Sequence, residues 1–199
     1  MITAALLGNP NVGKTTLFNY LTGSNQYVGN WAGVTVEKKE GYIGNSVRIV
    51  DLPGIYAMDT YSNEEKISKE FLEKGKVDVI INIVDASSLN RNLYLTLQLK
   101  QFGKPIILVL NMIDVAEAKG IKIDYQKLSK RLGVTVIPIS ASKRRGIEEV
   151  RKLLKGGNFF GPINENDYHY EEDEKEIIIG LVMCGNGIVY DGLRAGQSK

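Results

Sequence analysis

Short apolar runs alternate along the chain with longer stretches in which apolar residues recur at helical spacing. Nearly continuous apolar runs are typical of strands covered on both faces, as in a parallel sheet between helices. The runs that predict strands are Ile2–Leu7, Val47–Val50, Val77–Val84, Ile106–Leu110 and Val134–Ile139. The stretches that predict helices are Lys14–Leu21, Glu64–Lys74, Leu89–Gln101, Tyr125–Leu132 and Ile147–Leu154. This alternation indicates an α/β fold.

One pair of predicted strands interrupts the alternation. Val36–Tyr42 and Val47–Val50 flank the dipeptide Gly44-Asn45, with no helical stretch between them. Glycine and asparagine accept the backbone conformations of a tight turn, so this segment predicts a β-hairpin. The sequence therefore predicts an α/β domain with a six-stranded, mostly parallel sheet, one antiparallel edge strand and helices on both faces.

The pattern changes after Lys155. Gly156-Gly157 and Gly161-Pro162 punctuate the chain, and an acidic stretch over 171–176 precedes an apolar segment that glycines interrupt. Glycine and proline disfavour regular helices and strands. We therefore predict one folded domain over residues 1–155, followed by a linker and a short segment over 156–199.

Composition and charge narrow the classes of function. Lys and Arg total 25 against 23 Asp and Glu in 199 residues, so no large basic field indicates a nucleic-acid partner. Cys184 and His169 are the only residues of their kinds, which excludes an intrachain disulfide and disfavours a thiol or imidazole metal site. The chain begins without the features of a signal peptide, and no apolar run reaches the roughly 20 residues of a membrane-spanning helix. We expect a soluble chain in a reducing cytoplasm.

A glycine-rich loop lies between the first predicted strand and the first predicted helix. It fits the pattern G-x-x-x-x-G-K-S/T with the residues Gly8, Asn9, Pro10, Asn11, Val12, Gly13, Lys14 and Thr15. In this context backbone N–H groups and the start of the helix form a nest for phosphate oxygens. Lys14 would reach the β- and γ-phosphates and Thr15 would bind Mg²⁺, with Thr16 also at the nucleotide. Taken alone, the loop could be a chance glycine-rich turn.

A second element, Asp51-Leu52-Pro53-Gly54, stands at the end of a predicted strand. There the Asp51 carboxylate can hold Mg²⁺ through water, and the Gly54 N–H can contact the γ-phosphate. The loop between the two elements runs from about Ser24 to Thr35, and we predict Thr35 as the second protein oxygen on Mg²⁺. The alternatives are Thr16 and Thr22, both on the first predicted helix.

The third and fourth elements predict specificity for guanine. Asn111-Met112-Ile113-Asp114 follows the strand Ile106–Leu110 directly, and the Asp114 carboxylate can accept from both guanine N1–H and the exocyclic amine. Asn111 would brace the loop and meet the base edge with Met112. Ser140-Ala141-Ser142 follows the next strand, with the Ala141 N–H predicted to meet guanine O6. The alternative for Asp114 is an ordinary helix N-cap.

These four elements, in this order, resemble the Ras-like P-loop GTPases over roughly residues 1–155. The resemblance implies hydrolysis of GTP with Mg²⁺, with Lys14, Asn11, Thr35 and Gly54 at the reacting phosphate.

One position departs from the Ras pattern. Ras places a glutamine after the glycine of the second element, where this chain has Ile55. An aliphatic side chain cannot orient or polarise water, so we predict slow unassisted hydrolysis. Arg48 and Arg91 are candidate internal arginine fingers, but their sequence context does not favour either.

In a subset of these GTPases an asparagine at the position of Asn11 is linked to K⁺, whose charge stands in for an arginine finger. The resemblance implies a K⁺ site made by the Asn11 carboxamide and by backbone carbonyls of the loop around Gly29, Asn30 and Trp31. Asn11 could instead only shape the turn. Trp31 could likewise be an apolar anchor for its loop.

Three stretches, residues 8–23, 28–37 and 51–56, resemble the ferrous-iron transport protein B (FeoB) family. The Gly-Asn-Trp-Ala-Gly-Val-Thr loop, residues 29–35, is the specific part. The resemblance implies a cytoplasmic GTPase domain at the inner face of the membrane. That domain would regulate or power Fe²⁺ uptake through a membrane-embedded domain on the same polypeptide, with self-association left open. In that family a helical domain comes next, and residues 156–199 are too few for all of it, so we expect a linker or a truncated or altered remnant of that domain.

Two other functions stay open. One is a soluble, potassium-assisted GTPase of ribosome assembly or tRNA modification, which predicts a basic face or an RNA-binding module. The other is a binding switch with incidental hydrolysis, in which GTP orders Ser24–Thr35 and Gly54–Asn63 for a partner.

Overall fold

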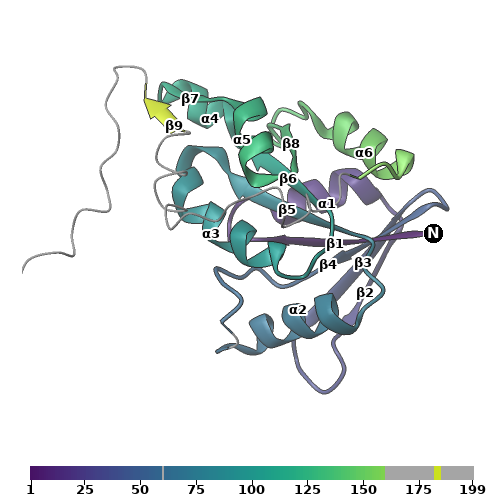
Figure 1. The fold of residues 1–199 in the computed structure, drawn as a ribbon. Coiled ribbons are helices and arrows are strands. Elements are labelled where there is room, and N and C mark those ends of the chain that lie inside the picture. The colour runs from purple at the N-terminus through teal and green to yellow at the C-terminus, as the bar shows by residue number, and fades with distance from the viewer. Residues whose placement is uncertain (60, 160–181, 185–199) are drawn as a thin grey trace, which may run out of the picture.

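The computed structural model describes residues 1–59, 61–159 and 182–184. A seven-stranded sheet in the order β2-β3-β4-β1-β5-β6-β8 forms its centre (Figure 1). The strands are β1 (Ile2–Gly8), β2 (Gln26–Asn30), β3 (Glu37–Ile43), β4 (Val47–Asp51), β5 (Val79–Asp85), β6 (Ile106–Asn111) and β8 (Thr135–Pro138). β4, β1, β5, β6 and β8 are parallel to one another, and β3 is antiparallel to both of its neighbours.

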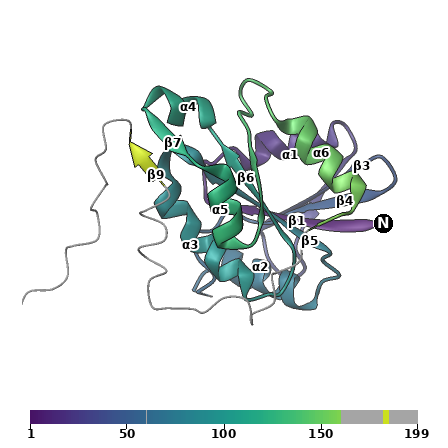
Figure 2. The same ribbon diagram turned by 45° about the horizontal axis from the view of Figure 1, so that its top comes forward.

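Helices cover both faces of this sheet (Figure 2). They are α1 (Lys14–Thr22), α2 (Asn63–Lys74), α3 (Leu89–Lys100), α4 (Ile113–Ala118), α5 (Tyr125–Leu132) and α6 (Ile147–Gly156), with a 3-10 turn η1 (Ala86–Ser88) before α3. Successive side chains of β1 enter opposite cores, because side chains alternate across a strand. Ala4 and Leu6 join the core under α1 and α6, whereas Ala5 and Leu7 join the core under α2, α3 and α5. This two-sided burial explains the uninterrupted apolar runs.

The second helix shows how local sequence sets an element's start. The Ser62 hydroxyl accepts from the Glu65 N–H at 3.1 Å, and the Glu65 carboxylate accepts from the Ser62 N–H at 3.2 Å. This reciprocal capping box satisfies backbone donors that the first helical turn leaves unpaired. α2 ends at Lys74, and the N–H of Gly75 donates to the Phe71 carbonyl at 2.9 Å.

The fold class is confirmed, but the sheet has seven strands rather than six. The added strand is β2, formed by residues that the sequence predicted as loop. Its side chains are mostly exposed, so no apolar alternation marks it, and pairing with β3 alone makes it a strand. The short elements α4 and β7 (Ile121–Ile123) also lacked a predicted counterpart.

The chain beyond α6 is described in part. Helix α6 ends at Gly156, close to the predicted boundary at Lys155. A short strand, β9 (Val182–Cys184), pairs antiparallel with β7. The acidic stretch over 171–176 and His169 lie outside the described residues. Within the three described ranges, none of the helices combines the length and apolar character needed to cross a bilayer.

Candidate functional site

The four predicted motifs meet at one edge of the sheet. The glycine-rich loop (residues 8–15) follows β1, Asp51 ends β4, Asn111 ends β6, and Ser140 lies just after β8. These four strands are parallel, so their carboxyl ends share an edge. In open α/β sheets this edge is where ligands bind.

The glycine-rich loop has a backbone that only particular residues allow. Asn11 and Gly13 have φ angles of 66° and 88°, in the left-handed region. A side chain at Gly13 would place its Cβ 2.3 Å from Nδ2 of Asn111, and one at Gly8 would lie 2.5 Å from the Ile83 carbonyl oxygen. The loop therefore needs glycine at both places. It turns directly into α1, whose first residues Lys14 and Thr15 have backbone N–H groups free of helical partners.

Lys14 and Asp51 form an ion pair at the centre of this edge. Burial raises the pKa of the Asp51 carboxyl above its usual value, and the Lys14 ammonium opposes that rise. Thr15 and Thr16, on the first turn of α1, are exposed. The pair brings together two residues that stand 37 positions apart in the sequence.

The segment after Asp51 contacts the glycine-rich loop. The Ile55 N–H donates to the Gly8 carbonyl at 3.2 Å, and a Cβ at Gly54 would lie 3.5 Å from Pro10. The Ile55 side chain is buried in the core under α2 and α3. Ile55 therefore contributes packing, and its side chain does not face this edge as a water-orienting residue would.

The loop between β2 and β3 projects from the same edge of the sheet. Lys39 lies opposite Asp51, the last residue of β4, so β3 begins beyond the end of its neighbour. Thr35 is exposed on this projecting loop. Gly29 pairs with Lys38 in the β2–β3 ladder, and the Trp31 carbonyl accepts from the Val34 N–H at 3.3 Å.

Trp31 anchors this loop to α2. Its ring meets that of Phe71 edge to face, with centroids 5.5 Å apart, and the Lys38 ammonium lies 5.0 Å from the Trp31 centroid. The ring packs against the same core as Ile55. The interpretation of Trp31 as an apolar anchor therefore has direct structural support.

Asn111 ties two loops of the site together. Its Nδ2 donates to the Val12 carbonyl at 2.8 Å, and its Oδ1 accepts from the Ala141 N–H at 2.9 Å. Both hydrogen bonds are buried, so each holds its loop firmly. The Ala141 N–H was predicted to meet guanine O6. In the structure it donates to Asn111 Oδ1, and its contact with guanine stays a prediction.

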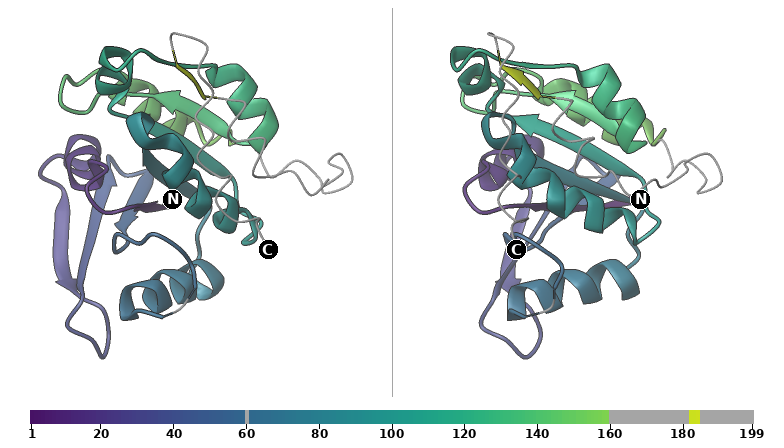
Figure 3. Two further views of the ribbon diagram at one scale, coloured as in Figure 1. Left: turned by 90° about the vertical axis from the view of Figure 1, so that its left-hand side faces the viewer. Right: turned by 60° about the vertical axis from the view of Figure 1, so that its left-hand side comes forward.

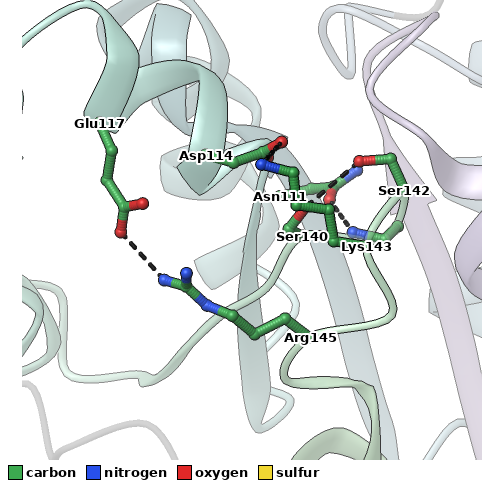
Figure 4. Close-up of polar contacts among 8 residues, drawn as sticks. Asn111, Asp114, Glu117, Ser140, Ser142, Lys143 and Arg145 are labelled. Carbon is green, nitrogen blue, oxygen red and sulfur yellow. Dashed lines mark hydrogen bonds and ion pairs between the residues drawn. The ribbon is translucent and has the colours of Figure 1, made fainter.

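Asp114 lies in the first turn of α4, beside the 140–146 loop (Figure 4). The turn depends on Met112, whose φ of 62° is left-handed. Asp114 Oδ2 pairs with the Lys143 ammonium at 3.3 Å, while Oδ1 is buried without a hydrogen-bond partner. The pKa of this carboxyl is lowered, first by a hydrogen bond from the Ser140 side chain and then by the hydrogen bond and positive charge of Lys143. Asp114 is thus a carboxylate with a buried oxygen free to accept from N–H donors.

Several contacts around the site have no counterpart in the sequence predictions. Ser140 and Ser142 hydroxyls lie 3.2 Å apart, and Arg145 pairs with Glu117 at 2.9 Å, which holds the 140–146 loop against α4 (Figure 4). Arg145 and Glu117 belong to no predicted motif and stand 28 positions apart, so only the fold could place them together.

The two candidate arginine fingers are engaged elsewhere. Arg48 makes two hydrogen bonds to Glu40, at 3.0 and 2.6 Å, between neighbouring strands. The Arg91 guanidinium lies over the Tyr56 ring at 5.0 Å. Both guanidinium groups thus have partners within the chain.

Comparison with known proteins agrees with this geometry. The family described as "Ferrous iron transport protein B" matches residues 2–154. The Fe(2+) transporter FeoB of Escherichia coli K12 is 53% identical over 160 residues, which cover 77% of this chain and 21% of the transporter. The chain thus spans about a fifth of the length of such relatives.

Solved structures place the likeness in one part of these relatives. A GDP-bound mutant of the S. thermophilus FeoB G-domain is 51% identical, with a TM-score of 0.74 over 78% of this chain and 60% of that one. The cytosolic domain of L. pneumophila FeoB is 48% identical, with a TM-score of 0.75 over 81% of this chain and 66% of that one. The chain belongs to the ferrous iron transport protein B family and carries its GTPase domain, the G-domain.

Proposed function

We propose that this chain binds GTP and GDP at the carboxyl edge of its sheet and hydrolyses GTP slowly with Mg²⁺. The observation that carries the proposal is Asp114, whose Oδ1 is buried without a hydrogen-bond partner beside the loops that Asn111 braces. Guanine offers two adjacent N–H donors to such a carboxylate, and adenine does not. A base without such donors is disfavoured, because the buried Oδ1 then stays without a hydrogen bond.

The phosphates would lie in the glycine-rich loop. Left-handed backbone at Asn11 and Gly13 supports a nest of N–H groups for anionic oxygens. Lys14 would turn from Asp51 toward the β- and γ-phosphates, and the Gly54 N–H would contact the γ-phosphate. Gly8, Asn9, Pro10 and Val12 shape the loop, with Thr16 following on α1.

The residues at this edge fit a magnesium ion. Hard oxygen donors are what Mg²⁺ prefers, and Thr15, Thr35 and the Asp51 carboxylate, the last through water, would supply them. When bound, the ion neutralises negative charge on the phosphate oxygens. The Asp51 carboxylate already holds a cation, the Lys14 ammonium, in the buried part of the edge.

We further propose that K⁺ raises the rate through Asn11. The Asn11 side chain is exposed beside the glycine-rich loop, where a carboxamide oxygen can accept a cation. The Trp31 carbonyl and the backbone of Gly29 take part in internal pairing, so either would have to leave that pairing to join the site. Asn11 is therefore the residue on which the potassium proposal rests, and the positive charge of the bound K⁺ would stand in for an arginine finger.

The experiment measures GTP hydrolysis with Mg²⁺ in K⁺ and in Na⁺ at equal ionic strength, for the chain and for Asn11→Ala. We expect slow hydrolysis that K⁺ stimulates in the unchanged chain alone. Equal rates in both salts would remove the role of Asn11, and the absence of hydrolysis in either would overturn the GTPase proposal. Asn19→Ala, on the exposed side of α1, is the matched control.

We propose that the domain works at the cytoplasmic face of the membrane. The E. coli relative is an Fe(2+) transporter of which this chain matches about a fifth, 21%, so the remainder would contain the membrane-embedded domain on the same polypeptide. Residues 1–155 would be the GTPase domain, and residues 156–199 would form the linker and short segment that follow it.

A binding switch differs from this proposal in one measurable respect. If GTP occupancy alone gates transport, a non-hydrolysable GTP analogue supports Fe²⁺ uptake by the complete polypeptide in vesicles. If hydrolysis powers transport, the analogue blocks uptake. Family membership favours iron uptake over ribosome assembly or tRNA modification.

A further inference from the structure

The loop over residues 140–146 contacts two helices of the proposed nucleotide site. One is α4, to which Lys143 and Arg145 are ion-paired. The other is α1, which begins at Lys14, the proposed phosphate ligand, and lies beside this loop (Figure 3). Ala141 of the loop shares a hydrophobic core with α1. A polar contact from this loop to α1 therefore joins the base side of the site to the phosphate side.

Arg144 makes such a contact, with Tyr20 on α1. Its Cζ lies 5.1 Å from the centre of the Tyr20 ring, and its Nε donates to the Tyr20 hydroxyl at 3.3 Å. A guanidinium is attracted both to an aromatic ring and to a hydroxyl oxygen, so one side chain makes two favourable contacts here. The two residues stand 124 positions apart, so the contact depends on the fold.

Tyr20 is itself held in place from a second side. Its side chain is half-buried and packs against the core that α1 shares with α6. Its carbonyl belongs to the last turn of α1, where carbonyls lack helical partners, and it accepts from Arg151 Nη2 on α6. Tyr20 therefore offers the loop a fixed point of attachment on α1.

The backbone at Arg144 is unusual for an arginine. Its φ of 55° is in the left-handed region, which side chains other than glycine and asparagine seldom adopt. Ser140 and Arg145 close this turn by exchanging two N–H to carbonyl hydrogen bonds, each at 3.0 Å. Surrounding contacts must hold a residue in such a conformation, and strain of this kind points to a role for the residue. The contact with Tyr20 is what the Arg144 side chain adds to the turn.

The position of this loop matters for the bound base. Its first residues are tied to β6, because the Ala141 N–H donates to Asn111 Oδ1. Its outer residues, 142–145, are exposed, so the contacts of their side chains hold this part of the loop against the two helices. Opening of the loop would remove the predicted contacts of residues 140–142 with guanine. Less stable segments open more often, and a loop that opens more often releases a ligand sooner.

We propose that Arg144 is a positioning residue for nucleotide binding. Through its contact with Tyr20, it holds the 140–146 loop against the base and lengthens the time for which GDP and GTP stay bound. The side chain acts through the loop rather than by touching the nucleotide. This inference rests on the proposed function, and it adds to that function two residues that lie outside the four motifs.

The experiment measures how fast methylanthraniloyl-GDP, a fluorescent derivative, leaves the 199-residue chain when excess GDP displaces it in the presence of Mg²⁺. Arg144→Ala should speed this dissociation about 5-fold, because the ring contact and the hydrogen bond are lost together. Arg144→Gly should speed it as well, although glycine suits the left-handed backbone better than arginine does. Arg131→Ala removes an exposed arginine of α5 and is the matched control, with an unchanged rate expected.

A double-mutant cycle separates the Arg144–Tyr20 contact from a general loosening of the loop. Tyr20→Phe keeps the ring and removes the hydroxyl that accepts from Arg144, so alone it should speed dissociation about 2-fold. In the Arg144→Ala background the same change should have no effect, because the donor is already gone. Equal effects of Tyr20→Phe in both backgrounds would show that the two residues act separately and would overturn the proposal.

The same measurement tells failure of this inference from failure of the proposed function. If the unchanged chain binds no labelled GDP, the proposed function fails, and the role of Arg144 fails with it. If the chain binds labelled GDP but Arg144→Ala and Arg144→Gly release it at the unchanged rate, the positioning role alone is overturned. Circular dichroism checks that each variant is folded. Arg144→Gly, which the turn accommodates, decides the outcome if Arg144→Ala does not fold.

Discussion

The two halves of the proposed nucleotide site are built differently. On the base side, Asn111 is 3% exposed and bonds to two loops, and Asp114 is held beside Lys143. On the phosphate side, Asn11, Thr35 and Gly54 are all exposed on loops. The base side is fixed by buried hydrogen bonds, whereas these three phosphate-side residues lie at the surface.

This difference matches the two tasks of the site, which are to select guanine and to bind and release the γ-phosphate. Discrimination between bases depends on polar groups that cannot find another partner, which requires a rigid and buried frame. Groups that must meet a γ-phosphate and then release it belong on segments that can move, and exposed loops meet that need. The comparison predicts that changes to Asn111 and Asp114 affect selectivity and folding together, and that changes to the exposed phosphate-side residues Asn11 and Thr35 spare folding.

The largest effect is expected from Asp114→Asn. The variant should bind GTP about 10²-fold more weakly or worse, because two charge-assisted hydrogen bonds of about 1.5–3 kcal/mol each are lost. Xanthine nucleotides should bind better, since their carbonyl suits the new amide donor. Competition binding measures both. Glu117→Gln, on the same helix, is the control, and an unchanged preference for GTP in Asp114→Asn would refute the base assignment.

Asn111→Ala should lower the free energy of unfolding by about 2–4 kcal/mol, since the Val12 carbonyl and the Ala141 N–H lose their buried partner. Urea denaturation followed by circular dichroism measures the loss. Asn90→Ala, exposed on α3, is the control and should change little. Equal stability of the two variants would mean that Asn111 does not brace the site.

Gln98→Ala should have an effect of about 1 kcal/mol, on the segment that follows Gly54. Gln98 Oε1 accepts from the Met58 N–H at 2.8 Å, and its Nε2 donates to Asp59 Oδ1 at 3.1 Å. Hydrogen exchange at the Met58 amide should speed up accordingly. Unchanged exchange there, against a Gln101→Ala control, would show that α3 does not hold this segment.

Thr35→Ala should have the smallest effect on folding, within about 0.5 kcal/mol, because the side chain is exposed. Hydrolysis of GTP with Mg²⁺ should nevertheless fall. Denaturation and a phosphate-release assay on the same preparation test both halves of the prediction. A large loss of stability would contradict the contrast between the two sides of the site, because it would mean that the Thr35 loop contributes to folding as the base side does.

Much of the fold could be predicted from the sequence. The apolar runs of β1, β5 and β6 are buried on both faces, and such uninterrupted apolar runs can be recognised as strands from the sequence. Strand β2 could not be predicted, because its residues are exposed and its pairing comes from β3. The bond between the Ala141 N–H and Asn111 Oδ1 could not be predicted either, because it joins residues 30 positions apart.

The sequence by itself determined the order of the elements and the four motifs at the ends of the strands. Those features depend on local spacing and on residue types with few conformational choices, such as Gly13 at a φ of 88°. Only the tertiary structure decided that Asn111 bonds to Val12, 99 positions away, that Asp114 keeps a buried oxygen without a hydrogen bond, and that Ile55 faces the core. Burial and long-range hydrogen bonds are properties of packed surfaces, so no local pattern specifies them.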